Sequence, residues 1–226
     1  MLRHLFGASA TSETMLGAIA RDAQETGALT GRPEFSDAVM DAMRTVPREA
    51  FVPKAEAAFA WENRPLPIGH GQTISQPYIV ALMTELLGVE PGARILEIGT
   101  GCGYQTAILC AMGATVYSIE VVEPLARAAA ARLTDLGYAQ ATVRAGDGGG
   151  GWPEHAPYDG IIVTAAAPSV PPALVDQLKP GACLLIPVGR AAMTQNLQRI
   201  CKRADGSCET TAVLPVAFVP LTVGRS

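Results

Sequence analysis

The segment 94–107 constrains the fold of this chain most, because it combines a short buried strand, a glycine turn and the start of a helix. The apolar run Ile95-Leu-Glu-Ile98 follows the turn signal Pro91-Gly92, as expected of a parallel strand that is buried on both faces. Residues 104–112 are compatible with a helix. Between strand and helix lie three glycines at alternating positions, Gly99, Gly101 and Gly103. This succession predicts a nucleotide-sized cleft.

The glycine spacing indicates which ligand such a cleft would take. The order is Gly-x-Gly-x-Gly, whereas dinucleotide sites use Gly-x-Gly-x-x-Gly and cradle a pyrophosphate. An acid, Glu97, stands two residues before the first glycine. S-adenosylmethionine has no pyrophosphate, and its cationic sulfonium and its amino group need acceptors. The pattern therefore favours S-adenosylmethionine as the cofactor over a nicotinamide dinucleotide.

Strand and helix patterns alternate along the chain and predict an α/β fold with a doubly wound, Rossmann-like sheet, mostly parallel with an antiparallel C-terminal edge. We expect a domain over residues 37–226, preceded by an N-terminal extension, 1–36, that holds a short helix. The proline- and glycine-rich segment 51–76 is expected to be a loop. Strands are expected at 95–98, 115–120, 141–144, 160–163, 183–186, 196–201 and 210–219. Helices are expected at 13–26, from an N-cap at Ser36 to Val46, and at 77–87, 104–112, 123–136 and 171–178, with a break at 27–33.

Composition and charge exclude several classes of protein. Of the 226 residues, 49% are hydrophobic, and the formal net charge of −4 without a Lys/Arg cluster argues against nucleic-acid binding. No apolar run approaches the roughly 18 residues of a membrane span, and the N-terminus carries no evident secretory signal. We therefore expect a cytoplasmic protein that binds neither nucleic acid nor membranes, and we expect it to be a monomer.

The cysteines and histidines give no sign of a metal site. The three histidines are scattered, and no two cysteines form a Cys-x-x-Cys pair. The favoured interpretation is a set of reduced thiols in a cytosolic protein, so we expect no metal and no disulfide. The cysteines are Cys102, Cys110, Cys183, Cys201 and Cys208.

Two further acids follow later strands. Glu120 ends the strand 115–120, and Asp147 follows the strand 141–144 in the sequence Gly146-Asp-Gly148. A carboxylate at the end of the second strand can accept hydrogen bonds from both ribose hydroxyls of an adenosine. An acceptor at Asp147 can meet the adenine amino group, although Asp-Gly alone is a common turn. Together with the glycines, these acids predict an adenosine-containing cofactor at the carboxyl-end edge of the sheet.

Several segments together resemble those of the protein L-isoaspartyl (D-aspartyl) O-methyltransferase family. The resemblance runs from about Asp37 to the C-terminus, and the part around Ser75 is specific to this family, whereas many methyltransferases share the glycine motif. Cys102 stands where the family usually has serine, and the stretch before Asp37 does not match. The similar segments are Val46–Pro53, Pro65–Pro77, Ile95–Tyr104, Gly146–Gly148, Tyr158–Asp159, Ile161–Pro168 and Phe218–Thr222.

The resemblance implies a Rossmann-like methyltransferase that transfers a methyl group from S-adenosylmethionine to the α-carboxylate of L-isoaspartyl, and of D-aspartyl, residues in damaged proteins or peptides. The ester would cyclise to a succinimide, whose hydrolysis regenerates some aspartate. By the same resemblance Ser75 is the active-site serine. The cofactor-binding residues are expected at Thr73, Ile74, Glu97, Gly99, Gly101, Glu120, Asp147, Gly148 and Thr222.

The chemistry of this transfer needs few catalytic side chains. A carboxylate is already ionised at neutral pH, so no general base is required, and the protein has mainly to align the reacting atoms. We therefore assign Ser75 to positioning one carboxylate oxygen by a hydrogen bond, and not to nucleophilic attack. Three alternatives stay open at this point: an enzyme that methylates an aspartate of one biosynthetic peptide, an NAD-dependent oxidoreductase, and a binding module without activity.

Overall fold

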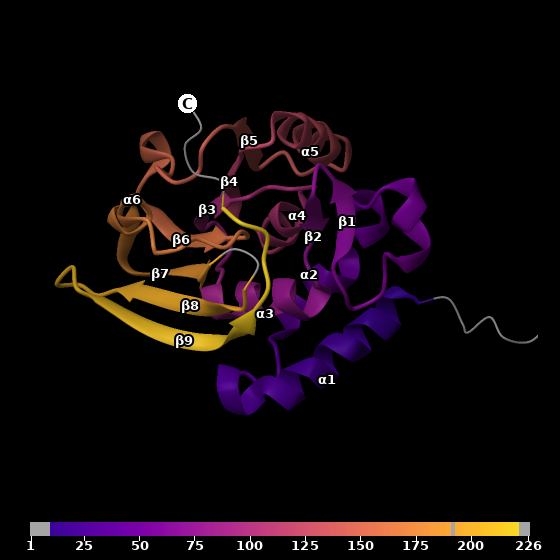
Figure 1. Cartoon of the computed structure of the whole chain (residues 1–226), viewed down its shortest axis with the longest axis horizontal. Coiled ribbons are helices and arrows are strands. Elements are labelled where there is room, and N and C mark those ends of the chain that lie inside the picture. The colour runs from indigo at the N-terminus through magenta and orange to yellow at the C-terminus, as the bar shows by residue number, and fades with distance from the viewer. Residues whose placement is uncertain (1–9, 191–192, 222–226) are drawn as a thin grey trace, which may run out of the picture.

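The computed structural model describes residues 10–190 and 193–221, and its centre is a seven-stranded sheet of order β5-β4-β3-β6-β7-β8-β9 (Figure 1). The strands from β5 to β7 pair in parallel, whereas β7, β8 and β9 pair antiparallel at one edge. The predicted doubly wound sheet with an antiparallel C-terminal edge is confirmed. The strands are β3 Arg94–Ile98, β4 Thr115–Glu120, β5 Ala141–Ala145, β6 Tyr158–Val163, β7 Leu178–Val188, β8 Gln195–Lys202 and β9 Cys208–Val216.

Helices cover both faces of this sheet, and local sequence accounts for their ends. The Ser36 hydroxyl accepts a hydrogen bond from the backbone N of Val39 at 3.5 Å at the start of α2. Pro77 opens α3, and Gly88 ends it in the left-handed conformation. The helices are α1 Ser12–Thr30, α2 Asp37–Thr45, α3 Pro77–Leu87, α4 Tyr104–Ala111, α5 Glu123–Asp135 and α6 Pro172–Asp176, with 3₁₀ helices at Arg48–Phe51, Lys54–Phe59 and Pro153–His155.

The alternating side chains of the central strand β3 divide the core into two layers. Ile95 belongs to the layer that contains the buried residues of α1 to α5, whereas Leu96 and Ile98 pack in the layer of α6. The chain continues from β3 to β4 and β5 on one side, and then to β6 and β7 on the other. The carboxyl ends of β3 and β6 therefore form a topological switch point, where ligands bind in folds of this class. Gly99 and Thr164 follow these two strand ends.

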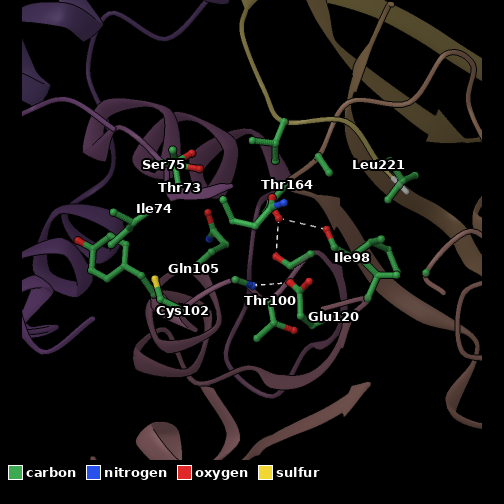
Figure 2. A pocket seen from close by; sticks show the side chains of 18 of the residues that line it. Thr73, Ile74, Ser75, Ile98, Thr100, Cys102, Gln105, Glu120, Thr164 and Leu221 are labelled. Atoms are coloured by element: carbon green, nitrogen blue, oxygen red, sulfur yellow. Dashed lines mark hydrogen bonds between the residues drawn. The ribbon is translucent and has the colours of Figure 1, made fainter. Parts of the chain in front are cut away.

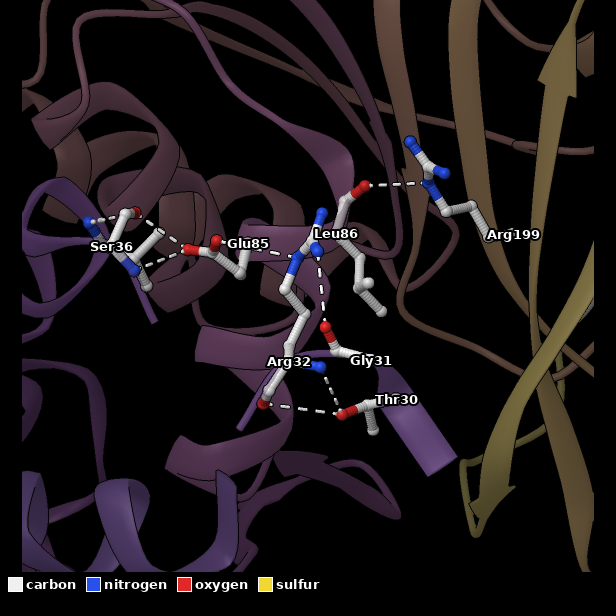
Figure 3. A network of polar contacts seen from close by, with 8 residues as sticks. Thr30, Gly31, Arg32, Ser36, Glu85, Leu86 and Arg199 are labelled. Carbon is white, nitrogen blue, oxygen red and sulfur yellow. Dashed lines mark hydrogen bonds and ion pairs between the residues drawn. The ribbon is translucent and has the colours of Figure 1, made fainter. Parts of the chain in front are cut away.

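The N-terminal helix α1 packs along α3, and polar contacts near the end of α3 connect the α1–α2 segment to the sheet (Figure 3). Glu85 of α3 accepts hydrogen bonds from the backbone N and the hydroxyl of Ser36 at 2.9 and 2.8 Å. The Glu85 carboxylate also lies 3.8 Å from the guanidinium of Arg32. On the other side, Nε of Arg199 on β8 donates to the carbonyl of Leu86 at 3.0 Å.

Helix α1 is longer than the sequence predicts. A break was expected over residues 27–33, but the helix continues to Thr30 and ends at Gly31, which has a φ of 67°. Gly27 lies inside the helix, where an added Cβ would come within 2.8 Å of Cβ of Pro33. This glycine therefore permits a close contact between two segments, and it does not end the helix.

The segment 51–76 contains a β-hairpin where the sequence predicts a loop. Strand β1, Leu66–Gly69, pairs antiparallel with β2, Gln72–Ile74. His70, with a φ of 53°, and Gly71, with a φ of 71°, form the turn between them, and positive φ values at both positions suit a two-residue hairpin turn. Proline is tolerated in β1 because a two-stranded sheet consists only of edge strands.

Strand β7 corrects two further expectations. It runs over the whole of Leu178–Val188, whereas the sequence predicts a strand only at 183–186 and a helix up to residue 178. The antiparallel register places Cys183 of β7 opposite Cys201 of β8, and the two form a disulfide. The expectation of reduced thiols is therefore wrong for this pair, because sequence spacing does not show which residues a hairpin brings face to face.

The other three cysteines are free: Cys102 and Cys110 are buried, and Cys208 is exposed.

Within residues 10–190 and 193–221, no helix is long and apolar enough to cross a membrane. Over the same part of the chain, His, Cys, Asp and Glu side chains nowhere gather in a group of three or more that could hold a metal ion.

Candidate active site

A pocket lies at the switch point, beside the carboxyl ends of β3, β4 and β6 (Figure 2). We call it the sheet-edge pocket. The β2 strand and the residues leading into α3 contribute to its lining, as does the chain that follows β9. It is lined by Gln72, Thr73, Ile74, Ser75, Val80, Ile98, Gly99, Thr100, Gly101, Cys102, Tyr104, Gln105, Ile119, Glu120, Val121, Gly148, Thr164, Ala165, Val219, Pro220 and Leu221.

The glycine turn that begins this pocket is held by the strands on both sides of β3. Gly99 has a φ of 95°, and its N–H donates to the carbonyl of Ile119 on β4 at 2.8 Å. The Thr164 hydroxyl, after β6, donates to the carbonyl of Ile98 at 3.2 Å and also to that of Gly99. A Cβ on Gly99 would come within 2.4 Å of this hydroxyl oxygen. Only glycine therefore fits between the two strand ends.

Glu120, at the end of β4, presents its carboxylate to the pocket although only 5% of the residue is exposed. One oxygen, Oε2, accepts the N–H of Gly101 at 2.7 Å, and Oε1 accepts the N–H of Val122 at 2.9 Å. Figure 2 shows the first of these bonds, which holds the carboxylate against the glycine turn. Each carboxylate oxygen has a second lone pair, so a ligand with two adjacent hydroxyls can still donate to this group.

Glu97 lies beneath the glycine turn and does not line the pocket. It is completely buried, and its Oε2 accepts hydrogen bonds from the hydroxyls of Ser118 at 2.6 Å and of Thr106. The Ser118 hydroxyl also contacts that of Thr100, in the turn, at 2.6 Å. Burial raises the pKa of Glu97 to about 7, although the hydrogen bonds from Ser118 and Thr106 oppose the shift, and the nearby Glu120 carboxylate adds to it. Glu97 thus belongs to a polar network that supports the turn from below.

The third predicted acid, Asp147, is exposed and does not line the pocket. Its Oδ1 accepts the N–H of Gly149 at 2.8 Å. The adjacent Gly148 does line the pocket, and a Cβ on it would come within 2.3 Å of Cγ2 of Ile98. Thr222 lies outside the residues that the structure describes.

Ser75 connects the sheet-edge pocket with a second one, which we call the outer pocket. The Ser75 side chain is half-buried, and within residues 10–190 and 193–221 its hydroxyl makes no hydrogen bond. Three other residues, Thr73, Thr164 and Val219, also line both pockets. The outer pocket is lined by Pro65, Thr73, Ser75, Gln76, Ile79, Thr164, Thr194, Pro215, Val216, Ala217, Phe218 and Val219.

The segment that carries Ser75 is held by polar side chains from distant parts of the chain. Nη2 of Arg48 donates to the Ser75 carbonyl at 2.9 Å. The next residue, Gln76, donates through Nε2 to Asp22 of α1 at 3.2 Å. The same Asp22 carboxylate accepts from Nδ2 of Asn63 at 2.8 Å. Helix α1 therefore contributes to the support of this segment.

The structure places seven of the predicted site residues in the lining of the sheet-edge pocket. Other lining residues were not predicted from the sequence. Thr100 and Gln105 were not singled out, although a polar residue within the glycine turn and another in the first turn of the following helix were usable signals. Thr164 was assigned only to the exit loop of β6. Arg48 lies in the similar segment Val46–Pro53, but its contact with Ser75 depends on tertiary structure and could not be inferred from the sequence. The seven are Thr73, Ile74, Ser75, Gly99, Gly101, Glu120 and Gly148.

Comparison with known protein families decides which enzyme class this geometry belongs to. The model of the protein-L-isoaspartate(D-aspartate) O-methyltransferase family matches residues 30–226. The chain belongs to this family. The resemblance noted in the sequence, the fold class and the enzyme class are thereby confirmed, whereas the peptide-tailoring and NAD-dependent alternatives are not supported.

Curated relatives and solved structures agree with the family. A protein-L-isoaspartate O-methyltransferase 2 from Polaromonas sp. is 55% identical over 202 residues, which cover 89% of this chain and 96% of the relative. Its namesake from Syntrophobacter fumaroxidans is 55% identical over 211 residues, covering 93% of this chain and 85% of the relative. A solved protein-L-isoaspartate O-methyltransferase superposes with a TM-score of 0.81 at 27% identity and covers 93% of this chain and 65% of that one. A Plasmodium falciparum structure in complex with S-adenosyl-L-homocysteine agrees in fold, with a TM-score of 0.77 at 24% identity, over 93% of this chain and 98% of that one.

Proposed function

We propose that this enzyme transfers a methyl group from S-adenosylmethionine to the α-carboxylate of L-isoaspartyl and D-aspartyl residues in damaged proteins, with Ser75 positioning that carboxylate. The family match confirms the predicted O-methyltransferase that acts on isoaspartate, and with it S-adenosylmethionine as the methyl donor. The methyl ester cyclises to a succinimide, and hydrolysis of the succinimide regenerates part of the normal aspartate. Isoaspartyl proteins or peptides are therefore the partners of this chain.

The observation that carries the assignment of Ser75 is its place between two pockets. Its side chain lines both the sheet-edge pocket and the outer pocket. A methyl transfer needs the donor and the acceptor on opposite sides of the reacting carbon, close enough to react in line. A cofactor in the sheet-edge pocket and a peptide in the outer pocket would meet where the two pockets adjoin, and Ser75 lines both pockets at that place.

The residues of the sheet-edge pocket fit S-adenosylmethionine. Glu120 offers carboxylate lone pairs to a ribose diol, and the backbone of Gly101 and Gly148 forms part of the pocket wall. Ile98 and Ile119 add apolar surface for an adenine ring. When bound, the cofactor supplies a methyl group that its own positive charge activates. We assign Glu97 to support of the turn from below, and we retain Asp147 and Thr222 as proposed cofactor contacts.

The lining of the two pockets supports a reaction that needs no general base. Among the described residues that line them there is no His, Lys, Arg or Asp, and the titratable ones are Cys102, Tyr104 and Glu120. Burial raises the pKa of Tyr104 to about 12 and raises that of Cys102, so neither ionises near neutral pH. A carboxylate substrate arrives already ionised. The Ser75 hydroxyl then acts by donating to one carboxylate oxygen and leaving the other free to react.

Three further features belong to the proposal. Residues 1–36 form an N-terminal extension to a catalytic domain over 37–226, and α1 supports the Ser75 segment through Asp22. The enzyme works as a monomer. It is located in the cytoplasm, and the disulfide between Cys183 and Cys201 is the observation that stands against this location.

Substrate selectivity tests the proposal directly. The wild-type enzyme is incubated with tritium-labelled S-adenosylmethionine and two peptides that differ only in an isoaspartyl or a normal aspartyl linkage. We expect labelling of the isoaspartyl peptide and little or none of its partner. A thermal-shift comparison of S-adenosylhomocysteine with NAD checks the cofactor separately, and only the former should stabilise the protein. Equal labelling of both peptides would exclude repair as the function.

A further inference from the structure

Arg48 is a buried cation next to the segment that carries Ser75. The residue is 0% exposed. Its Nε donates to the carbonyl of Ala60 at 2.9 Å, and its Nη2 donates to the carbonyls of Arg64 at 3.3 Å and Ser75 at 2.9 Å. The guanidinium lies over the ring of Tyr104, 4.9 Å from the ring centroid. One side chain therefore connects the Ser75 segment to the start of α4, which lines the sheet-edge pocket.

Stability alone does not explain this arrangement. Over residues 10–190 and 193–221, no carboxylate forms an ion pair with Arg48, and its Nη1 has no hydrogen-bond partner. A buried cation without a counter-charge is unfavourable, and a well-packed apolar side chain of similar volume is often at least as stabilising. An arginine at this position thus indicates a requirement beyond packing.

We propose that Arg48 is a positioning residue for the methyl transfer, which it assists by holding the Ser75 carbonyl and thereby the place of the Ser75 hydroxyl. This inference rests on the proposed function. Arg48 lines neither pocket, so it acts through Ser75 and not by touching the substrate. The held carbonyl and the hydroxyl belong to one residue, so a displaced carbonyl moves the hydroxyl with it. The planar guanidinium also holds three carbonyls at fixed directions, which a lysine ammonium cannot reproduce.

The test compares Arg48→Met and Arg48→Lys with the wild type in the isoaspartyl peptide assay, together with S-adenosylhomocysteine affinity by calorimetry. We expect Arg48→Met to lower kcat by roughly 10–100-fold, because a small misplacement of a positioning group is costly in rate. Arg48→Lys should recover part of that loss, and cofactor affinity should change by less than about threefold in both variants. Arg199→Met is the matched control: Arg199 also donates to a backbone carbonyl, that of Leu86, but Leu86 lines neither pocket, so this variant should retain wild-type kcat.

A double-mutant cycle with Ser75→Ala separates positioning from general destabilisation. If Arg48 acts through the serine, adding Arg48→Lys to Ser75→Ala should lower kcat by less than about twofold further. Effects that multiply in full, or Arg48 variants with wild-type kcat, would overturn the inference, as would full activity of Ser75→Ala alone. Circular dichroism and thermal unfolding verify that the variants are folded. If Arg48→Met does not fold, Arg48→Lys provides the test. Failure of the proposed function itself would show differently, as a wild-type enzyme that does not prefer the isoaspartyl peptide.

Discussion

The glycine turn and the Ser75 segment form opposite parts of one site, but the chain holds them in different ways. The glycine turn is fixed by the sheet: the N–H of Gly99 bonds to β4, Thr164 after β6 bonds back to the turn, and Glu120 accepts the N–H of Gly101. The Ser75 segment is fixed by single polar side chains from far away in sequence, Arg48 and Asp22 among them.

This difference has a functional consequence. The cofactor half of the site is a property of the sheet edge, so changes there should alter cofactor affinity and fold stability together. The substrate half depends on a few hydrogen bonds from single side chains. Changes there should therefore lower turnover while leaving cofactor binding intact, and the two halves can be tested separately.

Gly99→Ala should have the largest effect on cofactor affinity. The residue has a φ of 95°, and the new Cβ would lie 2.4 Å from the Thr164 hydroxyl oxygen, so backbone strain adds to a clash. Together these should weaken S-adenosylhomocysteine binding by about 3 kcal/mol, roughly 100-fold. Gly92→Ala is the control, because Gly92 has a similar φ of 84° with no atom within 4 Å of the added Cβ. Calorimetric titration compares the two variants, and equal affinities would mean that the turn is not the cofactor site.

Ser75→Ala addresses the other half of the site. We expect turnover of the isoaspartyl peptide to fall by roughly 10–1000-fold, the range for loss of one positioning hydrogen-bond donor, with cofactor affinity nearly unchanged. Ser207→Ala, at the exposed turn between β8 and β9, serves as the control. The measurements are radiochemical turnover and calorimetric affinity. A Ser75→Ala enzyme that has lost cofactor affinity and turnover to the same degree would contradict the separation of the two halves.

The same difference explains how much of the molecule could be predicted from the sequence. The strand, the glycines and Glu120 were found because hydrophobic periodicity and glycine spacing are local, and a parallel sheet brings strand ends to one edge without further information. The hairpin β1–β2 was missed because proline and glycine mark loops and tight hairpins alike. Neither Arg48 nor the pairing of Cys183 with Cys201 could be found in this way, since both depend on contacts between segments whose register is set only by the folded chain.

Glu120→Ala should have an intermediate effect, confined to the cofactor half. Its carboxylate accepts the N–H groups of Gly101 and Val122, so removing it leaves backbone donors unpaired as well as a ligand hydroxyl. We expect a loss of about 1–3 kcal/mol in S-adenosylhomocysteine affinity and a lower melting temperature. Glu123→Ala is the control, because Glu123 is exposed and its contact with Arg127 is a surface pair. Unchanged affinity in Glu120→Ala would limit this residue to support of the glycine turn, without a role in binding.

Glu97→Gln should have the smallest effect on cofactor affinity, and its effect on stability should depend on pH. Burial raises the pKa of this carboxyl to about 7, above its unfolded value, so between about pH 4.5 and pH 7 the folded chain holds a proton that the unfolded chain has released. The contribution of Glu97 to stability is therefore present at low pH and is lost as the pH rises through 7. From pH 5 to pH 8 the wild type should lose roughly 2–3 kcal/mol more free energy of unfolding than Glu97→Gln.

Urea denaturation of both proteins at the two pH values measures this difference, because the other titrating groups cancel in the comparison. The same variant also separates support of the turn from contact with the ligand. Glu97 makes its hydrogen bonds to Ser118 and Thr106 and lies outside the pocket lining, so at pH 6 Glu97→Gln should bind S-adenosylhomocysteine within about threefold of the wild type. A tenfold or larger loss of affinity at that pH would instead make Glu97 a direct cofactor ligand.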